Sequence, residues 1–192
     1  MTLVVSPLIS LMKDQVMALR NAGIPAGCIN SSMSLDELRE TYRDARYGAY
    51  KLLYVAPERL LTDGFCSLAQ ELEIPLVAVD EAHCISQWGQ DFRPSYLKIV
   101  EFLQRLPRRP AVAAFTATAT AQVRADIIRI LQLHEPETVV TGFDRPNLRF
   151  EVLRPKDKRT ALLQLLSERR DKSGIVYCAT RKTVEQVCGL LQ

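Results

Sequence analysis

Short, mostly apolar runs alternate with segments of helical spacing over the first two thirds of the chain. The runs contain three to five residues and lie at 3–5, 26–30, 51–55, 76–79 and 111–115. Strands that alternate with helices predict an α/β fold with a mostly parallel sheet. The run Leu76–Val79 contains no polar residue, which is typical of a strand buried on both faces.

Capping residues mark where several of the helices begin. Ser6 offers a capping hydroxyl, and Pro7 suits the first turn of a helix that is expected to reach Arg20. Ser34 and Glu37 form a capping box for a second helix, which should run through residue 46. Further helical segments are expected at 57–60, 96–106 and 116–131.

The segment Gly142–Asn147 is the clearest boundary in the chain, because it combines glycine, proline and polar residues between two patterned regions. After it, the pattern predicts a second strand-helix-strand-helix unit, whose last helix Thr180 caps. The expected elements are strands at 148–152 and 174–178 and helices at 158–169 and from 181 onward.

Composition and charge exclude some classes of protein. The chain is 47% hydrophobic and 24% charged, as in ordinary globular proteins. It shows no apolar run of membrane-spanning length and no basic-then-apolar leader pattern, so export is not expected. Its five scattered cysteines form no C-x-x-C pair, which predicts reduced thiols and no zinc site.

Residues 1–100 carry 9 Lys and Arg against 12 Asp and Glu, whereas residues 101–192 carry 16 against 10. A basic second half suits phosphate contact, although without the motifs a solvated charged face would be the better explanation.

Two carboxylates follow the apolar run Leu76–Val79 directly. Ligands of open α/β sheets bind beyond the carboxyl ends of the strands, so Asp80 is well placed to hold Mg²⁺ on a nucleotide phosphate. Glu81 beside it suits a general base for an attacking water. An acidic pair alone would more often be a solvated turn, but here a histidine and an aromatic loop with Trp88 and Phe92 follow at once.

The segment 80–89, DEAHCISQWG, with Asp91–Pro94 resembles motif II and the aromatic-rich loop of RecQ-family DNA helicases, which couple ATP hydrolysis to 3′-to-5′ unwinding. Further matches extend from Val5 to Cys178, nearly the whole chain. The resemblance implies a RecA-like sheet with helices on both faces. It also implies that residues 1–145 are a first RecA-like domain without its N-terminal part, and that residues 146–192 begin a second such domain.

The resemblance further implies roles for individual residues. Asp80 holds Mg²⁺ through water, Glu81 is the general base, and His83 joins the nucleotide site to motif III. Motif III carries two residues of the ATP site, Thr116 and Thr118. The residues implied to contact DNA are Ser6, Lys13, Arg59, Gln87, Trp88, Phe92, Arg93 and Arg181. Trp88 and Phe92 are expected to be exposed, where they could stack on unpaired bases.

The phosphate-binding loop G-x-x-x-x-G-K-[ST] is absent from the 192 residues. The resemblance places it before this segment, after a strand in the middle of the sheet, and places motifs V and VI after Gln192. The chain is therefore expected to be a fragment of a RecQ-like helicase and inactive by itself. Loss of a central strand should leave unpaired edges on both sides of a gap and favour aggregation.

The helicase interpretation implies ATP and Mg²⁺ as cofactors and single-stranded and duplex DNA as partners, in recombination and repair. Composition favours a bacterial cytoplasm, at the nucleoid, with the nucleus as the alternative in a eukaryote. Protein partners are not predicted. Two alternatives remain open: a non-catalytic single-stranded-DNA-binding or adaptor protein derived from such a helicase, and a DEAH-type ATPase that acts on RNA. Trp88 and Phe92 argue against RNA, because the aromatic loop is a RecQ feature.

Overall fold

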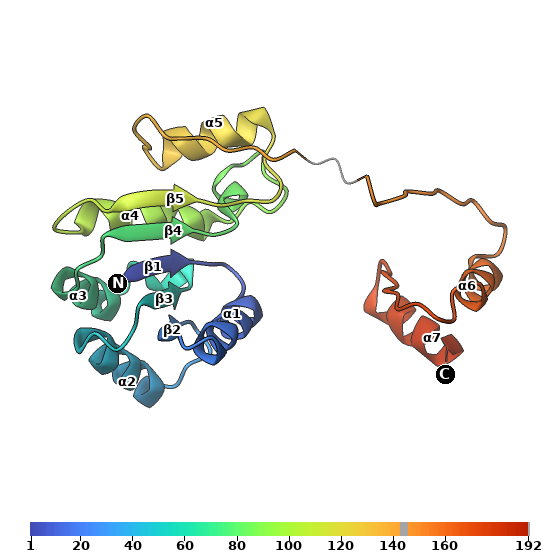
Figure 1. Cartoon of the computed structure of the whole chain (residues 1–192), viewed down its shortest axis with the longest axis horizontal. Helices are drawn as coiled ribbons and strands as arrows, with labels where there is room; N and C mark the ends of the chain where they lie inside the picture. The colour runs from blue at the N-terminus through green and yellow to red at the C-terminus, as the bar shows by residue number, and fades with distance from the viewer. Residues whose placement is uncertain (143–145, 192) are drawn as a thin grey trace. The chain divides into compact units, whose positions relative to one another are not determined.

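The computed structural model describes residues 1–142 and 146–191 and divides the chain into two compact units, Met1–Val139 and Val140–Gln192 (Figure 1). The domain boundary expected after residue 145 falls at residues 143–145, which lie outside the described part of the chain.

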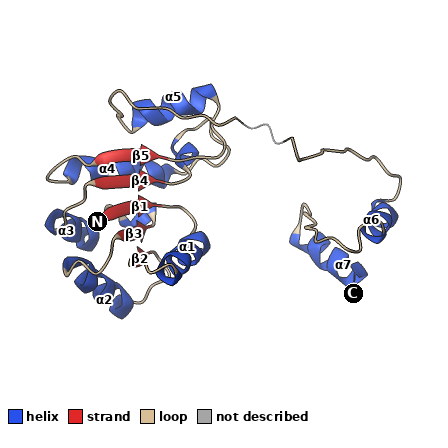
Figure 2. Cartoon of the chain, in the orientation of Figure 1, coloured by secondary structure: helices blue, strands red, loops and turns tan. Residues whose placement is uncertain are grey.

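Unit 1 is built on one parallel sheet, as the alternating pattern predicted (Figure 2). The strand order is β2-β3-β1-β4-β5. The strands are β1 (Thr2–Val5), β2 (Ala26–Ile29), β3 (Leu52–Val55), β4 (Leu76–Val79) and β5 (Ala111–Ala114). All five lie within the apolar runs or differ from them by one residue, which confirms the α/β class.

All five strands end level with one another. Val5 at the end of β1 pairs with Val55 and with Val79, and Val55 pairs with Ile29. Val79 in turn pairs with Ala114 at the end of β5. The polar residues that follow these strands therefore emerge together at one edge, where open α/β sheets bind their ligands.

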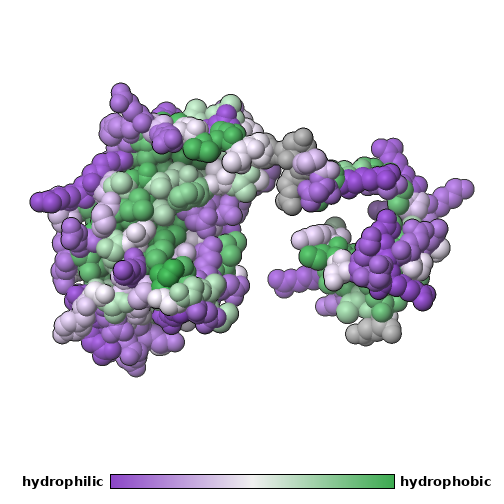
Figure 3. Space-filling view, viewed as in Figure 1, coloured by the Kyte–Doolittle hydropathy of each residue, from purple (hydrophilic) through white to green (hydrophobic). Residues whose placement is uncertain are grey.

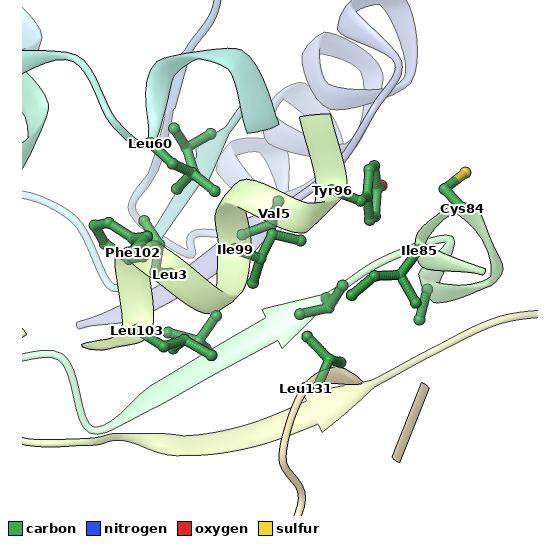
Figure 4. Close-up of a cluster of buried hydrophobic side chains, with 14 of the residues drawn as sticks. Leu3, Val5, Leu60, Cys84, Ile85, Tyr96, Ile99, Phe102, Leu103 and Leu131 are labelled. Carbon is green, nitrogen blue, oxygen red and sulfur yellow. The ribbon is translucent and has the colours of Figure 1, made fainter. Parts of the chain in front are cut away.

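Helices cover both faces of the sheet, as expected. On one face Met12 and Val16 of α1 pack with Val4 and Tyr54 of the sheet. On the other face a larger core joins the sheet to the remaining helices of the unit (Figure 4). The α-helices of the unit are α1 (Ile9–Asn21), α2 (Leu35–Arg46), α3 (Asp63–Glu71), α4 (Lys98–Arg105) and α5 (Ala121–Ile130). Three 3₁₀ helices precede or join them: η1 (Pro57–Arg59), η2 (Ala82–Ile85) and η3 (Pro94–Leu97).

One predicted cap is confirmed and another is wrong. Ser34 and Glu37 form the complete capping box at the start of α2, with each side chain bonded to the other residue's backbone N–H. Helix α1 instead begins at Ile9, after Leu8, and no side chain caps it. The Ser6 hydroxyl is unavailable to α1 because it donates to the carboxylate of Asp80, 3.2 Å away.

The gap expected in the middle of the sheet is not present in the described part of unit 1. Strand β1 pairs with both β3 and β4, and β4 pairs with β5, so the ladder is continuous. The expected gap is therefore wrong, and the sheet has its two edges at β2 and β5. At the β5 edge Ala111 is exposed and Phe115 is 58% exposed, and hydrophobic residues reach the surface of the unit (Figure 3).

Unit 2 contains the helices α6 (Lys158–Ser167) and α7 (Arg181–Leu191). Thr180 accepts a hydrogen bond from the Thr183 backbone N–H, which confirms the predicted cap of α7. The strands expected at 148–152 and 174–178 are not formed. A strand needs a neighbour for its backbone groups, and these segments pair with none in the described part of the unit, which leaves side chains such as Phe150 and Tyr177 exposed. No helix within 1–142 and 146–191 has the length and apolar character to span a membrane.

Candidate nucleotide site and aromatic loop

Asp80 lies immediately beyond β4, at the level edge of the sheet. Its backbone N–H donates to the carbonyl of Val5, 2.9 Å away, which ties it to β1. One carboxylate oxygen accepts the Ser6 hydroxyl at 3.2 Å, and the other accepts the Glu81 backbone N–H at 3.0 Å. The side chain is thus held at the strand end from two sides.

These oxygens fit a magnesium ion that is bound mainly through water and phosphate. Mg²⁺ prefers oxygen ligands and is commonly held by one or two carboxylates, with the remaining positions filled by water and nucleotide. Asp80 and the Ser6 hydroxyl supply such oxygens. Within 1–142 and 146–191 the structure contains no group of three or more His, Cys, Asp or Glu side chains arranged as metal ligands.

Glu81 has a left-handed backbone, with φ 47° and ψ 44°. This conformation is uncommon for residues other than glycine, and outliers of this kind gather at functional sites. The neighbouring peptide groups are fixed on both sides: the Ala82 N–H donates to the carbonyl of Phe115 at 2.9 Å, and the Tyr96 hydroxyl donates to the carbonyl of Asp80 at 2.8 Å.

His83 connects Glu81 to the segment after β5. The residue is 8% exposed, and its Nδ1 lies 3.2 Å from a Glu81 carboxylate oxygen and 3.0 Å from the Thr116 hydroxyl. The same hydroxyl accepts the Thr118 backbone N–H at 3.2 Å. The structure therefore brings Thr116, which follows β5, to the acid and the histidine of the segment after β4.

The aromatic loop folds back tightly against this cluster. The Gly89 N–H donates to the carbonyl of Ser86 at 3.0 Å. A Cβ at position 89 would lie 2.2 Å from the carbonyl oxygen of His83, which is far inside van der Waals contact. Only glycine fits here. Farther along, the Arg93 N–H donates to the carbonyl of Cys84 at 2.9 Å and closes the loop.

Trp88 stands out from the loop with 70% of its surface exposed, and Gln87 before it is also exposed. Phe92 is half-buried, so the expectation that both aromatic residues are exposed is right for Trp88 alone. The backbone of Trp88 is held in place, because its N–H donates to the Ser86 hydroxyl at 3.2 Å.

Ser86 and Asp126 form a contact that the sequence did not indicate. Ser86 is fully buried, and its hydroxyl donates to the Asp126 carboxylate of α5 at 2.7 Å. Arg129 also donates to this carboxylate at 2.7 Å, and together the two hydrogen bonds lower the pKa of Asp126, with Arg129 the larger cause. The loop that carries Trp88 is thereby fastened to α5. Forty residues separate the partners, so no local pattern could have revealed the contact.

The lowered pKa of Asp126 predicts how stability depends on pH. A carboxyl group with a folded pKa below its unfolded value of about 3.9 stabilises the protein above that pH and loses this effect as pH falls through the folded pKa. We expect the difference in unfolding free energy between the wild type and Asp126→Asn to be constant near pH 7 and to shrink below about pH 4. Urea unfolding at several pH values measures it.

Glu40→Gln is the control, because Glu40 forms an exposed ion pair with Arg43 and such pairs contribute little. A difference between the wild type and Asp126→Asn that stays the same from pH 7 to pH 3 would contradict the assigned cause.

The other residues expected to contact DNA differ in their exposure and in the hydrogen bonds that they already make. Arg93 donates twice to Asp91 and once to the carbonyl of Pro7, so its guanidinium is already engaged. The half-buried Arg59 donates to the carbonyl of Asn30 at 3.2 Å. Lys13 on α1 is exposed, and Arg181 is exposed at the start of α7, in unit 2.

The parallel sheet of unit 1 thus carries Asp-Glu-Ala-His at the carboxyl end of an inner strand. Residues 1–127 match the family model described as DEAD/DEAH box helicase. The chain is 48% identical to the ATP-dependent DNA helicase RecQ of Bacillus subtilis, over 97% of this chain and 32% of that protein. The RecQ protein of Pasteurella multocida is 42% identical, over 100% of this chain and 30% of its own length. This chain therefore belongs to the DEAD/DEAH box helicase family and, within it, to the RecQ helicases.

The chain spans about a third of the length of these curated relatives. Its fold is also similar to that of the Mycobacterium smegmatis helicase Lhr, solved with single-stranded DNA and AMP-PNP. The TM-score is 0.64 at 18% identity, and the match covers 99% of this chain and 27% of that one. The expected RecA-like fold of a helicase core is confirmed.

Proposed function

We propose that this chain forms part of an ATP-dependent DNA helicase that unwinds DNA from 3′ to 5′ and serves recombination and repair. The observation that carries the proposal is the link from Glu81 through His83 to Thr116, next to a loop that exposes Trp88. The two RecQ relatives support DNA as the substrate, because each is named as an ATP-dependent DNA helicase. The proposed location is the cytoplasm of a bacterium, at the nucleoid, or the nucleus in a eukaryote.

In the proposed reaction, Asp80 would hold magnesium, and the ion would neutralise charge on the transferred phosphate. Glu81 orients and deprotonates the attacking water, as a general base. His83 places its Nδ1 within hydrogen-bond distance of both the Glu81 carboxylate and the Thr116 hydroxyl, and it is proposed to link the two. Thr118 is tied to the same hydroxyl and completes the proposed ATP contacts of this chain.

Positioning supplies most of the catalysis in phosphoryl transfer, and backbone N–H groups and a lysine of a phosphate-binding loop commonly provide it. The 192 residues contain no such G-x-x-x-x-G-K-[ST] sequence. We therefore infer that this chain does not hydrolyse ATP until a phosphate-binding loop is supplied.

The residues proposed to contact DNA are Ser6, Lys13, Arg59, Gln87, Trp88, Phe92 and Arg93 in unit 1 and, separately, Arg181 in unit 2. Trp88 has the strongest support, because a mostly exposed indole on a fixed backbone suits stacking on an unpaired base. Gln87 and Lys13 are exposed on the same unit. The support for Ser6 and Arg93 is weaker, since their side chains already bond to Asp80 and Asp91.

Trp88 is the single tryptophan of the chain, so its fluorescence reports on this loop alone. We expect single-stranded DNA to quench it, because the indole stacks on a base. We also expect Trp88→Ala to weaken the binding of a labelled oligonucleotide roughly 5- to 150-fold, which corresponds to about 1–3 kcal/mol. Fluorescence anisotropy of the oligonucleotide measures the affinity of both proteins.

Tyr47→Ala is the matched control. Tyr47 is 84% exposed, but it lies at the end of α2 and leads to the start of β3. It is therefore near the amino ends of the strands, whereas Trp88 follows a carboxyl end. Equal affinities of the two variants, or no binding by the wild type, would count against the proposed DNA contacts. An RNA oligonucleotide of the same sequence tests the RNA-dependent alternative.

A further inference from the structure

Tyr96 is a buried tyrosine whose hydroxyl reaches the nucleotide site from a distant part of the chain. Its side chain is 0% exposed, and it lies in η3, after the aromatic loop (Figure 4). The hydroxyl donates to the backbone carbonyl of Asp80 at 2.8 Å. Sixteen residues separate these partners, so the contact joins the far end of the loop to the strand end of β4.

The carbonyl that Tyr96 holds belongs to the peptide group between Asp80 and Glu81. The N–H of the same peptide group donates to the Asp80 carboxylate at 3.0 Å. Rotation of this group would change φ of Glu81, which stands at 47°, in the left-handed region. For a residue with a Cβ, leaving that region lowers the conformational free energy. Such a residue stays there only if its surroundings hold it.

We propose that Tyr96 is a positioning residue, whose hydroxyl holds the Asp80–Glu81 peptide group and thereby keeps Glu81 in the left-handed conformation. That conformation directs the Glu81 carboxylate to His83, 3.2 Å away. The inference rests on the proposed function where it concerns catalysis, because it assumes that Glu81 is the general base. The structural part of the inference stands independently.

Two further observations support this role. Burial, the largest cause, raises the pKa of Tyr96 above its ordinary value, so the hydroxyl keeps its proton and remains a donor at neutral pH. The Tyr96 backbone N–H donates to the carbonyl of Arg93 at 2.9 Å, which fixes η3 to the end of the loop. The Tyr96 hydroxyl is therefore fixed in two ways, by the backbone hydrogen bond of Tyr96 and by the packing of its buried ring.

The structural test compares Tyr96→Phe with the wild type by amide hydrogen exchange of the isolated chain. Phenylalanine keeps the packed ring and removes only the donor. We expect the Glu81 and Ala82 amides to exchange about 3- to 10-fold faster, which is the range for the loss of one hydrogen bond. Tyr50→Phe is the control, since it removes the hydroxyl of a half-buried tyrosine that is bonded to Asp44. Unchanged exchange at residues 81 and 82 would overturn the proposal.

Glu81→Gly provides a second variant, because glycine takes the left-handed conformation without strain. Adding Tyr96→Phe to Glu81→Gly should then change exchange at position 82 less than Tyr96→Phe does alone. If Tyr96→Phe alone does not fold, recovery of folding in the double variant supports the proposal. Failure of the double variant to fold would contradict it.

The catalytic part is tested in a chimera in which this chain replaces the matching segment of Bacillus subtilis RecQ. Tyr96→Phe should lower kcat for ATP hydrolysis about 3- to 10-fold with an unchanged KM for ATP. A normal rate in Tyr96→Phe beside an inactive Glu81→Gln variant would refute the role of Tyr96 alone. Normal rates in both variants would refute Glu81 as the base, and the exchange experiment would then decide the structural role.

Discussion

Glu81→Gln is expected to lower DNA-stimulated ATP hydrolysis about 10²- to 10⁴-fold, the usual contribution of a general base. Glutamine has the shape of glutamate but cannot accept the proton of the attacking water. The measurement is phosphate release at saturating ATP and single-stranded DNA, in the chimera with Bacillus subtilis RecQ. That protein supplies the remaining length of an ATP-dependent DNA helicase.

Binding of DNA should survive in the same variant, because the exposed Trp88 is fastened through Ser86 to α5 and does not depend on the charge of Glu81. Glu71→Gln is the control. Glu71 is the last residue of α3 and pairs with Arg46 of α2. An ATPase rate within a few fold of the wild type in Glu81→Gln would refute the assigned base.

Phe102→Ala is expected to lower the free energy of unfolding by about 3–5 kcal/mol, as large-to-small changes of buried aromatic residues do. Phe102 is 1% exposed, and its ring centroid lies 5.6 Å from that of Phe65, so the substitution opens a cavity between α3 and α4. Urea unfolding of the isolated chain, followed by circular dichroism, gives the difference.

Phe115→Ala is the matched control, because Phe115 is 58% exposed and its removal leaves no comparable cavity. A single cooperative transition is expected for unit 1, since its sheet is continuous. Gradual unfolding, or equal destabilisation by the two substitutions, would instead favour the partly folded fragment that a gap in the sheet would produce.

The elements of unit 1 could be predicted from the sequence because each has a local cause. The run Leu76–Val79 becomes β4 without a change of bounds, and Ser34 and Glu37 cap α2 as their spacing indicates. The cluster of Glu81, His83 and Thr116 could be expected only through the resemblance to RecQ helicases. Periodicity places residues on elements but does not say which elements meet.

The predictions that failed depend on partners distant in the sequence. Ser6 was expected to cap α1, but Asp80, seventy-four residues later, accepts its hydroxyl. The segments 148–152 and 174–178 alternate as strands do, yet a strand forms only where a neighbouring strand accepts its hydrogen bonds. The contacts of Ser86 and Tyr96 escaped prediction for the same reason, because ordinary serines and tyrosines give no sign of a distant partner.

The level strand ends make the geometry of the site sensitive to residues that never touch it. One residue along a strand corresponds to about 3.3 Å, whereas the hydrogen bond from Ser6 to Asp80 is 3.2 Å long. If β4 slid by one position along β1, the contact would break and the side chain of Asp80 would turn to the other face of the sheet. The side chains inside β1 and β4 fix the register of the two strands by their packing. They therefore also fix the position of Asp80 relative to Ser6.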